Sequence, residues 1–177
     1  RKQEFIDRMK DVISKLRVGD PSNEDTQMGP MINIHAAQRI EEQVNKTIEQ
    51  GARLICGGKR EDAFYYPTIL DNVTRKMDVA KDMEIFGPVI PVIGFDTEEE
   101  AIEIANQSSY GLCGCVITKD YSRGLKIANK LECGGAVVNG ASFFRSFEMP
   151  FGGWKHSGIG NEGVSSTLQE MSRIKTI

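Results

Sequence analysis

Short apolar runs rich in β-branched residues alternate with amphipathic stretches along this 177-residue chain, and the alternation restricts the folds open to it. Residues 89–95, 112–117 and 136–138 are the runs that predict buried strands. Helices are predicted between them, over residues 97–106 and 121–131. Because a strand, a helix and a second strand in succession form a parallel crossover unit, we predict an α/β protein. Its expected form is three-layered, with a mostly parallel sheet and helices on both faces.

Further elements are predicted on either side of this middle region. The expected helices cover 2–16, 36–48 and 164–171, and short strands cover 53–56 and 67–70. Thr97, followed by three glutamates, predicts a capping box at the start of its helix. Residues 1–173 are expected to form one domain. Residues 174–177 have too little to pack against alone, so we expect them to begin a strand that joins another sheet, as in an oligomer.

Charge and composition exclude several classes of function. The 22 basic and 25 acidic residues give a net charge of −3 without the basic clusters that nucleic-acid binding needs. No apolar run approaches the ~20 residues that cross a membrane. Four cysteines without CxxC spacing indicate reduced thiols and a cytoplasmic protein. Because the chain opens at Arg1 with neither an initiator methionine nor a leader, we expect an internal fragment.

A glycine-rich tract near the C-terminus imitates a dinucleotide-binding motif. Residues 158–163 read G-x-G-x-x-G, and a helix is predicted after them. A dinucleotide fingerprint, however, follows a buried strand directly and has an acidic ribose partner roughly 20 residues later, and this tract has neither. We therefore interpret the glycines as positions that allow positive φ and close backbone packing at a helix entry.

The tract Glu84-Ile85-Phe86-Gly87-Pro88 is predicted to be a turn that leads into the strand over residues 89–95. Pro88 disfavours helical backbone at Gly87, which fits a turn. A carboxylate and an aromatic ring two residues apart could together present an acceptor and a flat apolar face, as a ribose and a heteroaromatic ring require. From composition alone, a solvent-facing Glu84 and a core Phe86 are the default interpretation of the tract.

Several tracts, in order along almost the whole chain, resemble the C-terminal part of the aldehyde dehydrogenase superfamily. They are Val18-Gly19-Asp20-Pro21 with Gly29-Pro30-Met31-Ile32, Tyr65-Tyr66-Pro67-Thr68-Ile69-Leu70, Glu84–Pro88, Glu98–Asn106 with Tyr110-Gly111-Leu112, Gly134–Asn139 and Met149–Gly163. The resemblance implies an enzyme that oxidises an aldehyde to a carboxylic acid with NAD or NADP. Its cysteine thiolate would form a thiohemiacetal and then a thioester, which water hydrolyses.

The resemblance assigns roles to two residues of the turn and leaves others outside the chain. Glu84 would hold the hydroxyls of the nicotinamide ribose, and Phe86 would lie beside the nicotinamide ring. The nucleophilic cysteine, the general base and most of the nucleotide-binding domain would precede Arg1. No residue of this chain is therefore expected to be catalytic, and the fragment alone should be inactive.

The segment 139–149 would, by the same resemblance, line the aldehyde's entrance tunnel. Phe144 and Phe151 would contribute apolar walls, together with Phe143 and Phe147. Arg145 could pair a carboxylate or phosphate of the substrate, which favours a semialdehyde such as succinate semialdehyde. The aromatic segment also allows a small hydroxyaldehyde such as lactaldehyde. An equally simple interpretation pairs Arg145 with Glu148 or leaves it in water.

The cysteines and histidines give no sign of a nucleophile or a metal site. Cys113 and Cys115 lie two apart in an apolar strand, so we predict small core residues on one face of it. Cys56 and Cys133 have no histidine or helix N-terminus near them in sequence to lower their pKa. The two histidines are too few and too far apart for a metal site, and Lys155 is predicted to be structural.

Two classes of function remain open from the sequence. The first is the catalytic domain of an NAD(P)-dependent aldehyde dehydrogenase that works as a dimer or tetramer with its N-terminal nucleotide-binding domain. The alternative is a non-catalytic oligomerisation or binding module, in which the family tracts maintain packing only. A relative that reduces activated acids or phosphates ranks last, because such enzymes usually match the glycine-rich tract poorly.

Overall fold

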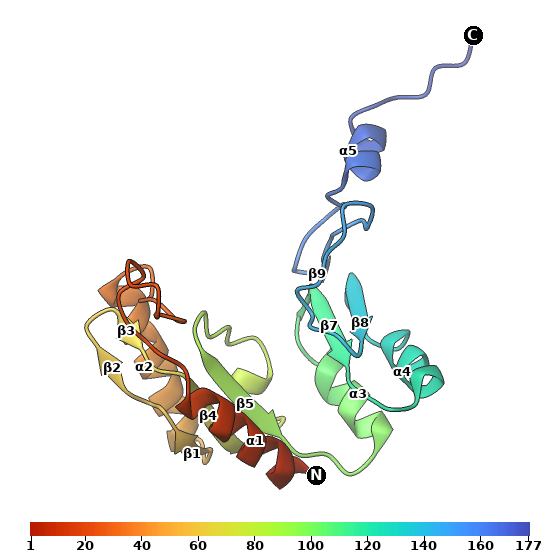
Figure 1. The fold of residues 1–177 in the computed structure, drawn as a ribbon. Coiled ribbons are helices and arrows are strands. Elements are labelled where there is room, and N and C mark those ends of the chain that lie inside the picture. The colour runs from red at the N-terminus through yellow and green to blue at the C-terminus, as the bar shows by residue number, and fades with distance from the viewer. The chain divides into compact units, whose positions relative to one another are not determined.

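The computed structural model describes all 177 residues, which divide into two compact units, Arg1–Phe95 and Asp96–Ile177. The first unit contains α1 (Lys2–Ser14), α2 (Ile34–Glu49), β1 (Arg53–Cys56), β2 (Arg60–Glu61), β3 (Phe64–Tyr65), β4 (Thr68–Val73), the 3-10 turn η1 (Asp78–Ala80) and β5 (Val89–Ile93). The second contains α3 (Glu98–Asn106), β6 (Tyr110–Gly111), β7 (Cys113–Val116), α4 (Tyr121–Ala128), β8 (Gly135–Val138), β9 (Trp154–Lys155) and α5 (Val164–Glu170). The class is α/β, as predicted (Figure 1).

The first unit is a small mixed sheet with a helix on each face. The strand order is β1-β4-β5, with β4 parallel to β5 and antiparallel to β1. Successive residues of a strand point to opposite faces, and the core follows this rule. Ile69 packs with Ile6 of α1, whereas Leu70 packs with Ile40 of α2 (Figure 1). Central strand β4 is therefore buried on both faces.

The second unit is built around one parallel crossover. Strands β7 and β8 pair in parallel, from Cys113 with Gly135 to Val116 with Val138, and α4 connects them. Gly124 of α4 lies against the sheet so closely that a Cβ there would come 2.6 Å from a methyl of Val138. Helix α3 begins at the predicted cap, where the hydroxyl of Thr97 accepts a hydrogen bond from the amide of Glu100. This strand–helix–strand prediction is confirmed.

The expectation of one mostly parallel sheet needs correction. The chain forms four small sheets, of which β2–β3 and β6–β9 are antiparallel pairs and β1-β4-β5 is mixed. β1 runs antiparallel to β4 because the β2–β3 hairpin joins them, with no crossover helix between. The core prediction for the cysteines is also wrong in part, since Cys115 is exposed and Cys113 is only half-buried.

The C-terminal tail does not pair with a strand of this chain. Residues 172–177 follow α5 without regular structure, and Ile174 and Ile177 are fully exposed. The expectation that 174–177 begins an oligomerisation strand therefore stays a prediction. None of the helices combines the length and apolar character that crossing a membrane demands.

Candidate functional site

The turn that carries Glu84 and Phe86 is fixed by backbone contacts on both sides. The amide of Gly87 donates to the carbonyl of Ile85 (2.7 Å), and the carbonyl of Pro88 accepts from the amide of Thr68 at the start of β4 (2.9 Å). Ile85 packs against the α2 side of the core. A Cβ at Gly87 would come 2.4 Å from the Cδ1 of Ile40, so a larger residue there would force the Ile40 side chain or the turn to shift.

Anchoring Ile85 inward leaves its two neighbours facing outward. Phe86 is 73% exposed, so it lies outside the hydrophobic core of this chain. Glu84 is also exposed, and only its main-chain carbonyl is engaged, by the side-chain amide of Gln43 (3.2 Å). A free carboxylate and a bare aromatic ring on one rigid turn are the groups that a ribose diol and a flat heteroaromatic ring require. The residues present thus fit a nicotinamide nucleotide.

A second group of predicted residues comes together within the other unit. The guanidinium carbon of Arg145 lies 3.7 Å from the centroid of the Phe151 ring, a stacked cation–π contact. Nη2 of Arg145 donates to Oε2 of Glu162 at 3.3 Å. The expected alternative partner, Glu148, does not take this role. The structure thus brings Arg145 and Phe151 together and adds Glu162, which the sequence did not suggest.

The segment between β8 and Phe151 exposes its aromatic side chains. Phe143, Phe144 and Phe147 are 85%, 59% and 97% exposed. Free apolar surface of this size is uncommon on a finished protein surface and marks a binding wall or a contact with more protein. The exposure agrees with a substrate-facing segment but does not by itself distinguish these two uses.

The glycine-rich tract holds Phe151 and Glu162 together rather than cradling a phosphate. Positive φ is found at Gly158, Gly160 and Gly163, as the sequence predicted. At Gly152 a Cβ would lie 2.3 Å from the carbonyl oxygen of Gly160. With a side chain at Gly152, these two segments of the tract could therefore not lie so close together. Helix α5, which follows, has only seven residues and no side-chain cap.

Lys155 is structural, as predicted. Its ammonium donates to the carbonyls of Asn106 (2.7 Å) and Ser108 (3.0 Å) and pairs with Glu132 (2.7 Å). Because Asn106 ends α3, the lysine caps that helix at the end where the dipole favours a cation. Asn106 in turn bonds the turn after α4 through its side chain, to Lys130 and Glu132. This network fixes the tract that carries Phe151.

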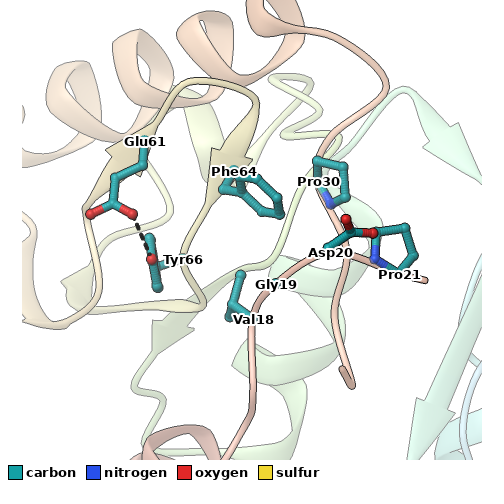
Figure 2. A pocket seen from close by; sticks show the side chains of 8 residues that line it. All are labelled: Val18, Gly19, Asp20, Pro21, Pro30, Glu61, Phe64 and Tyr66. Carbon is teal, nitrogen blue, oxygen red and sulfur yellow. Dashed lines mark hydrogen bonds between the residues drawn. The ribbon is translucent and has the colours of Figure 1, made fainter. Parts of the chain in front are cut away.

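A separate hollow of ≈ 610 Å³ lies in the first unit, away from the predicted residues. Its lining comes from the segment after α1 and from the β2–β3 hairpin: Val18, Gly19, Asp20, Pro21, Pro30, Glu61, Phe64 and Tyr66 (Figure 2). The polar groups in it already have partners. Tyr66 donates to Glu61 (2.9 Å), Glu61 pairs with Lys59, and Asp20 accepts from Ser22. The contacts of its polar side chains therefore give no indication of a bound ligand.

Cys133 does not have the environment of a nucleophile. Burial raises the pKa of the Cys133 thiol, and the nearby Cys113 adds to the effect. A raised pKa keeps the thiol protonated, whereas nucleophilic cysteines need the thiolate. The structure also contains no cluster of His, Cys, Asp and Glu that could hold a metal ion.

The family model for the aldehyde dehydrogenase family matches residues 1–177, the whole chain. The chain belongs to the aldehyde dehydrogenase family. Among curated relatives, it is 45% identical to lactaldehyde dehydrogenase of Methanococcus aeolicus over 98% of its own length. It is 42% identical to 3-sulfolactaldehyde dehydrogenase of Priestia megaterium, again over 98%. The chain spans 37% and 36% of these two proteins, so it corresponds to little more than a third of each.

Solved structures of the family agree with the fold. The glyceraldehyde-3-phosphate dehydrogenase GapN of Methanocaldococcus jannaschii, complexed with NADP, superposes with a TM-score of 0.93 at 45% identity. That comparison covers 99% of this chain and 38% of the other. An aldehyde dehydrogenase of Mycobacterium tuberculosis, complexed with NAD+, gives 0.90 at 40% identity and covers 96% of this chain and 36% of the other. The small sheets described above are therefore those of an aldehyde dehydrogenase segment.

Proposed function

We propose that this chain is part of an NAD(P)-dependent enzyme that oxidises a small aldehyde to a carboxylic acid. The observation that carries the proposal is the rigid turn on which an unpaired Glu84 carboxylate and the exposed Phe86 ring stand together. Membership of the family supports it, as do relatives solved with NADP and with NAD+. In the whole protein we expect the small sheets to join a larger three-layer arrangement, and residues 174–177 to extend a sheet of a dimer or tetramer.

In this proposal the chain's own residues orient the cofactor and the substrate. When bound, the nicotinamide accepts a hydride from the substrate carbon, which makes the oxidation possible. Glu84 would accept hydrogen bonds from the ribose hydroxyls, and Phe86 would lie beside the nicotinamide ring. Because Ile85 is packed and Gly87 lies against Ile40, the backbone that carries Glu84 and Phe86 does not need to be ordered when the nucleotide binds.

For the substrate, we propose a small aldehyde with an anionic group or a hydroxyl near the carbonyl. Arg145 supplies a guanidinium to a carboxylate, phosphate or sulfonate group, and Phe144 and Phe151 enclose the carbon chain. Succinate semialdehyde, lactaldehyde and 3-sulfolactaldehyde are the candidates, the last two because relatives are named for them. Arg145 stacked on Phe151 supports the anionic group in particular.

Glu84→Gln in the full-length protein tests the cofactor role. An amide binds a diol less strongly than a carboxylate does, so we expect the KM for NAD(P)+ to rise about tenfold. The measurement is NAD(P)H formation at saturating aldehyde. Glu24→Gln is the matched control, because Glu24 is an exposed glutamate elsewhere in the same unit. Unchanged cofactor kinetics in Glu84→Gln would refute the assignment. If the wild type binds no NAD(P)+ and oxidises no aldehyde, the proposed enzyme is wrong and the chain belongs to a non-catalytic oligomerisation or binding module.

Arg145→Ala tests the substrate role. We expect its KM for succinate semialdehyde to rise about tenfold, because a charge-assisted pair with the carboxylate is lost. The KM for butanal, a neutral aldehyde of the same chain length, should stay within about twofold. Arg173→Ala serves as the control, since it removes an exposed arginine from the same unit. Equal loss with both aldehydes would show that Arg145 only supports the packing of its segment.

A further inference from the structure

Glu162 and Phe151 face each other across a short antiparallel bridge. The amide of Phe151 donates to the carbonyl of Glu162 (2.8 Å), and the amide of Glu162 donates to the carbonyl of Phe151 (2.7 Å). Two residues that exchange both hydrogen bonds project their side chains to the same face. The bridge therefore places a carboxylate beside an aromatic ring, and Arg145 reaches across both.

The two contacts of Arg145 use different parts of the guanidinium. Phe151 covers a flat face at 3.7 Å, a position that fixes the orientation of the group. Glu162 takes one edge through Nη2 at 3.3 Å, longer than the ~2.7–2.9 Å of a strong charge-assisted bond. Arg145 and Glu162 are 51% and 78% exposed, so water screens their attraction. The ring fixes the plane of the guanidinium, while the screened carboxylate adds only a weak attraction.

We propose that Glu162 is an internal competitor for Arg145 and thereby sets how strongly the site discriminates between anionic and neutral aldehydes. The inference rests on the proposed function, because it concerns the substrate end of the same site. An incoming carboxylate or sulfonate must displace Glu162 or share the guanidinium with it, against the repulsion of a like charge. A neutral aldehyde does neither. Glu162 thus weakens anion binding without contact with the reacting carbon, and it is a specificity residue rather than a catalytic one.

The test is Glu162→Gln in the full-length protein, with succinate semialdehyde and butanal as a charged and a neutral aldehyde of equal length. Glutamine keeps the size and the bridge but removes the charge. We expect the KM for succinate semialdehyde to fall about two- to fivefold, the range that an exposed pair allows. The kcat and the KM for butanal should not change. Glu162→Asp keeps the charge and should leave both aldehydes within about twofold.

A double-mutant cycle and a binding measurement complete the experiment. In the Arg145→Ala background, Glu162→Gln should no longer change the KM for succinate semialdehyde, because the guanidinium for which Glu162 and the substrate compete is absent. Succinate, the anionic product, should bind Glu162→Gln more tightly than the wild type by calorimetry, by the same factor and less so at high salt. This readout does not need turnover, so it separates the inference from the proposed activity.

The outcomes point in distinct directions. A KM for succinate semialdehyde that is unchanged or higher in Glu162→Gln overturns the inference, as does an equal shift for butanal. Succinate that binds both proteins equally overturns it too. If the wild type oxidises neither aldehyde yet succinate binds Glu162→Gln more tightly, the proposed activity fails and the competition between Glu162 and the anion stands.

Discussion

Gly134→Ala is expected to detach the segment that carries Phe151 from the start of β8. A Cβ at Gly134 would lie 1.7 Å from the carbonyl oxygen of Gly152 and 2.7 Å from its carbonyl carbon. These are backbone atoms, so no side chain can rotate away, and the segment or the strand must move. The φ of Gly134 is not among the positive ones, so the cost comes from the contact and not from backbone strain.

The expected magnitude is large because the movement reaches beyond one contact. Overpacking against backbone costs about 3 kcal/mol of unfolding free energy. Gly152 adjoins both Phe151 and Gly160, so the Phe151–Glu162 bridge should open as well. We expect a lower melting temperature, faster hydrogen exchange at the amides of Phe151 and Glu162, and a raised KM for succinate semialdehyde.

Gly135→Ala is the matched control for this prediction. Its Cβ would meet only the sulfur of Cys113, at an ordinary contact distance of 3.5 Å. The two substitutions are chemically identical and adjacent, and they differ only in what the added methyl touches. Exchange at Phe151 and Glu162 should therefore stay at the wild-type rate in Gly135→Ala. Equal behaviour of the two variants would contradict the close approach of Gly152 to β8.

The sequence predicted structure correctly where a pattern within one short segment determines it. The cap at Thr97, the crossover between 113–116 and 135–138 and the positive φ of Gly158, Gly160 and Gly163 all agree with the structure. Capping, periodicity and glycine backbone freedom act over a few residues, so a single sequence contains them. The structural role of Lys155 was also correct, although its partners at Asn106 and Ser108 lie far away in sequence.

Pairing between distant segments was not predictable in the same way. An apolar strand looks alike whether its neighbour is parallel or antiparallel, so the antiparallel pairing of β1 with β4 was missed. Alternation placed Cys113 and Cys115 on one face correctly, yet it could not say whether anything covers Cys115. In the sequence, Glu162 is only an isolated acidic residue in a glycine-rich tract, so no local pattern indicated its role. Its relation to Arg145 depends on the bridge to Phe151, which local patterns do not reveal.

Asp71→Asn is the second substitution with a large expected effect, and it acts on the first unit. The side chain of Asp71, on β4, is only 2% exposed. Its Oδ2 accepts from Nη2 of Arg53 on β1 at 2.9 Å. Oδ1 lies 2.8 Å from the ammonium of Lys2 on α1, an ion pair that lacks the direction of a good hydrogen bond. One carboxylate thus ties a helix and a neighbouring strand to the central strand.

Burial alone would raise the pKa of Asp71, but its partners outweigh burial and lower the pKa below the usual value. These partners are the ammonium of Lys2, the backbone amide of Asn72 and the guanidinium of Arg53. Asparagine can keep one acceptor but not the charge, so we expect a loss of about 2 kcal/mol in the unfolding free energy. Lys2 and Arg53 are partly exposed and can turn to water, which limits the loss.

Asp11→Asn is the control, because Asp11 also pairs with a lysine, Lys15, at 2.7 Å, but on the surface of α1. Exposed pairs of this kind contribute about 0.5 kcal/mol or less. Both variants are measured by denaturant unfolding. Hydrogen exchange of the β4 amides is the probe, so that the first unit is observed by itself. A similar loss for the two aspartates would mean that burial of Asp71 adds nothing to its pairing.

The pH dependence gives an independent check with a defined sign. Because the pKa of Asp71 is lower in the folded than in the unfolded chain, its stabilisation is complete above the unfolded value, about 4. It is lost as the pH falls through the folded value, since the unfolded state then binds the proton first. The wild type should therefore lose stability in the first unit more steeply below about pH 4 than Asp71→Asn, and the two curves should converge in acid. Parallel curves down to low pH would show that the carboxylate of Asp71 is not the charge that holds α1 and β1 to the sheet.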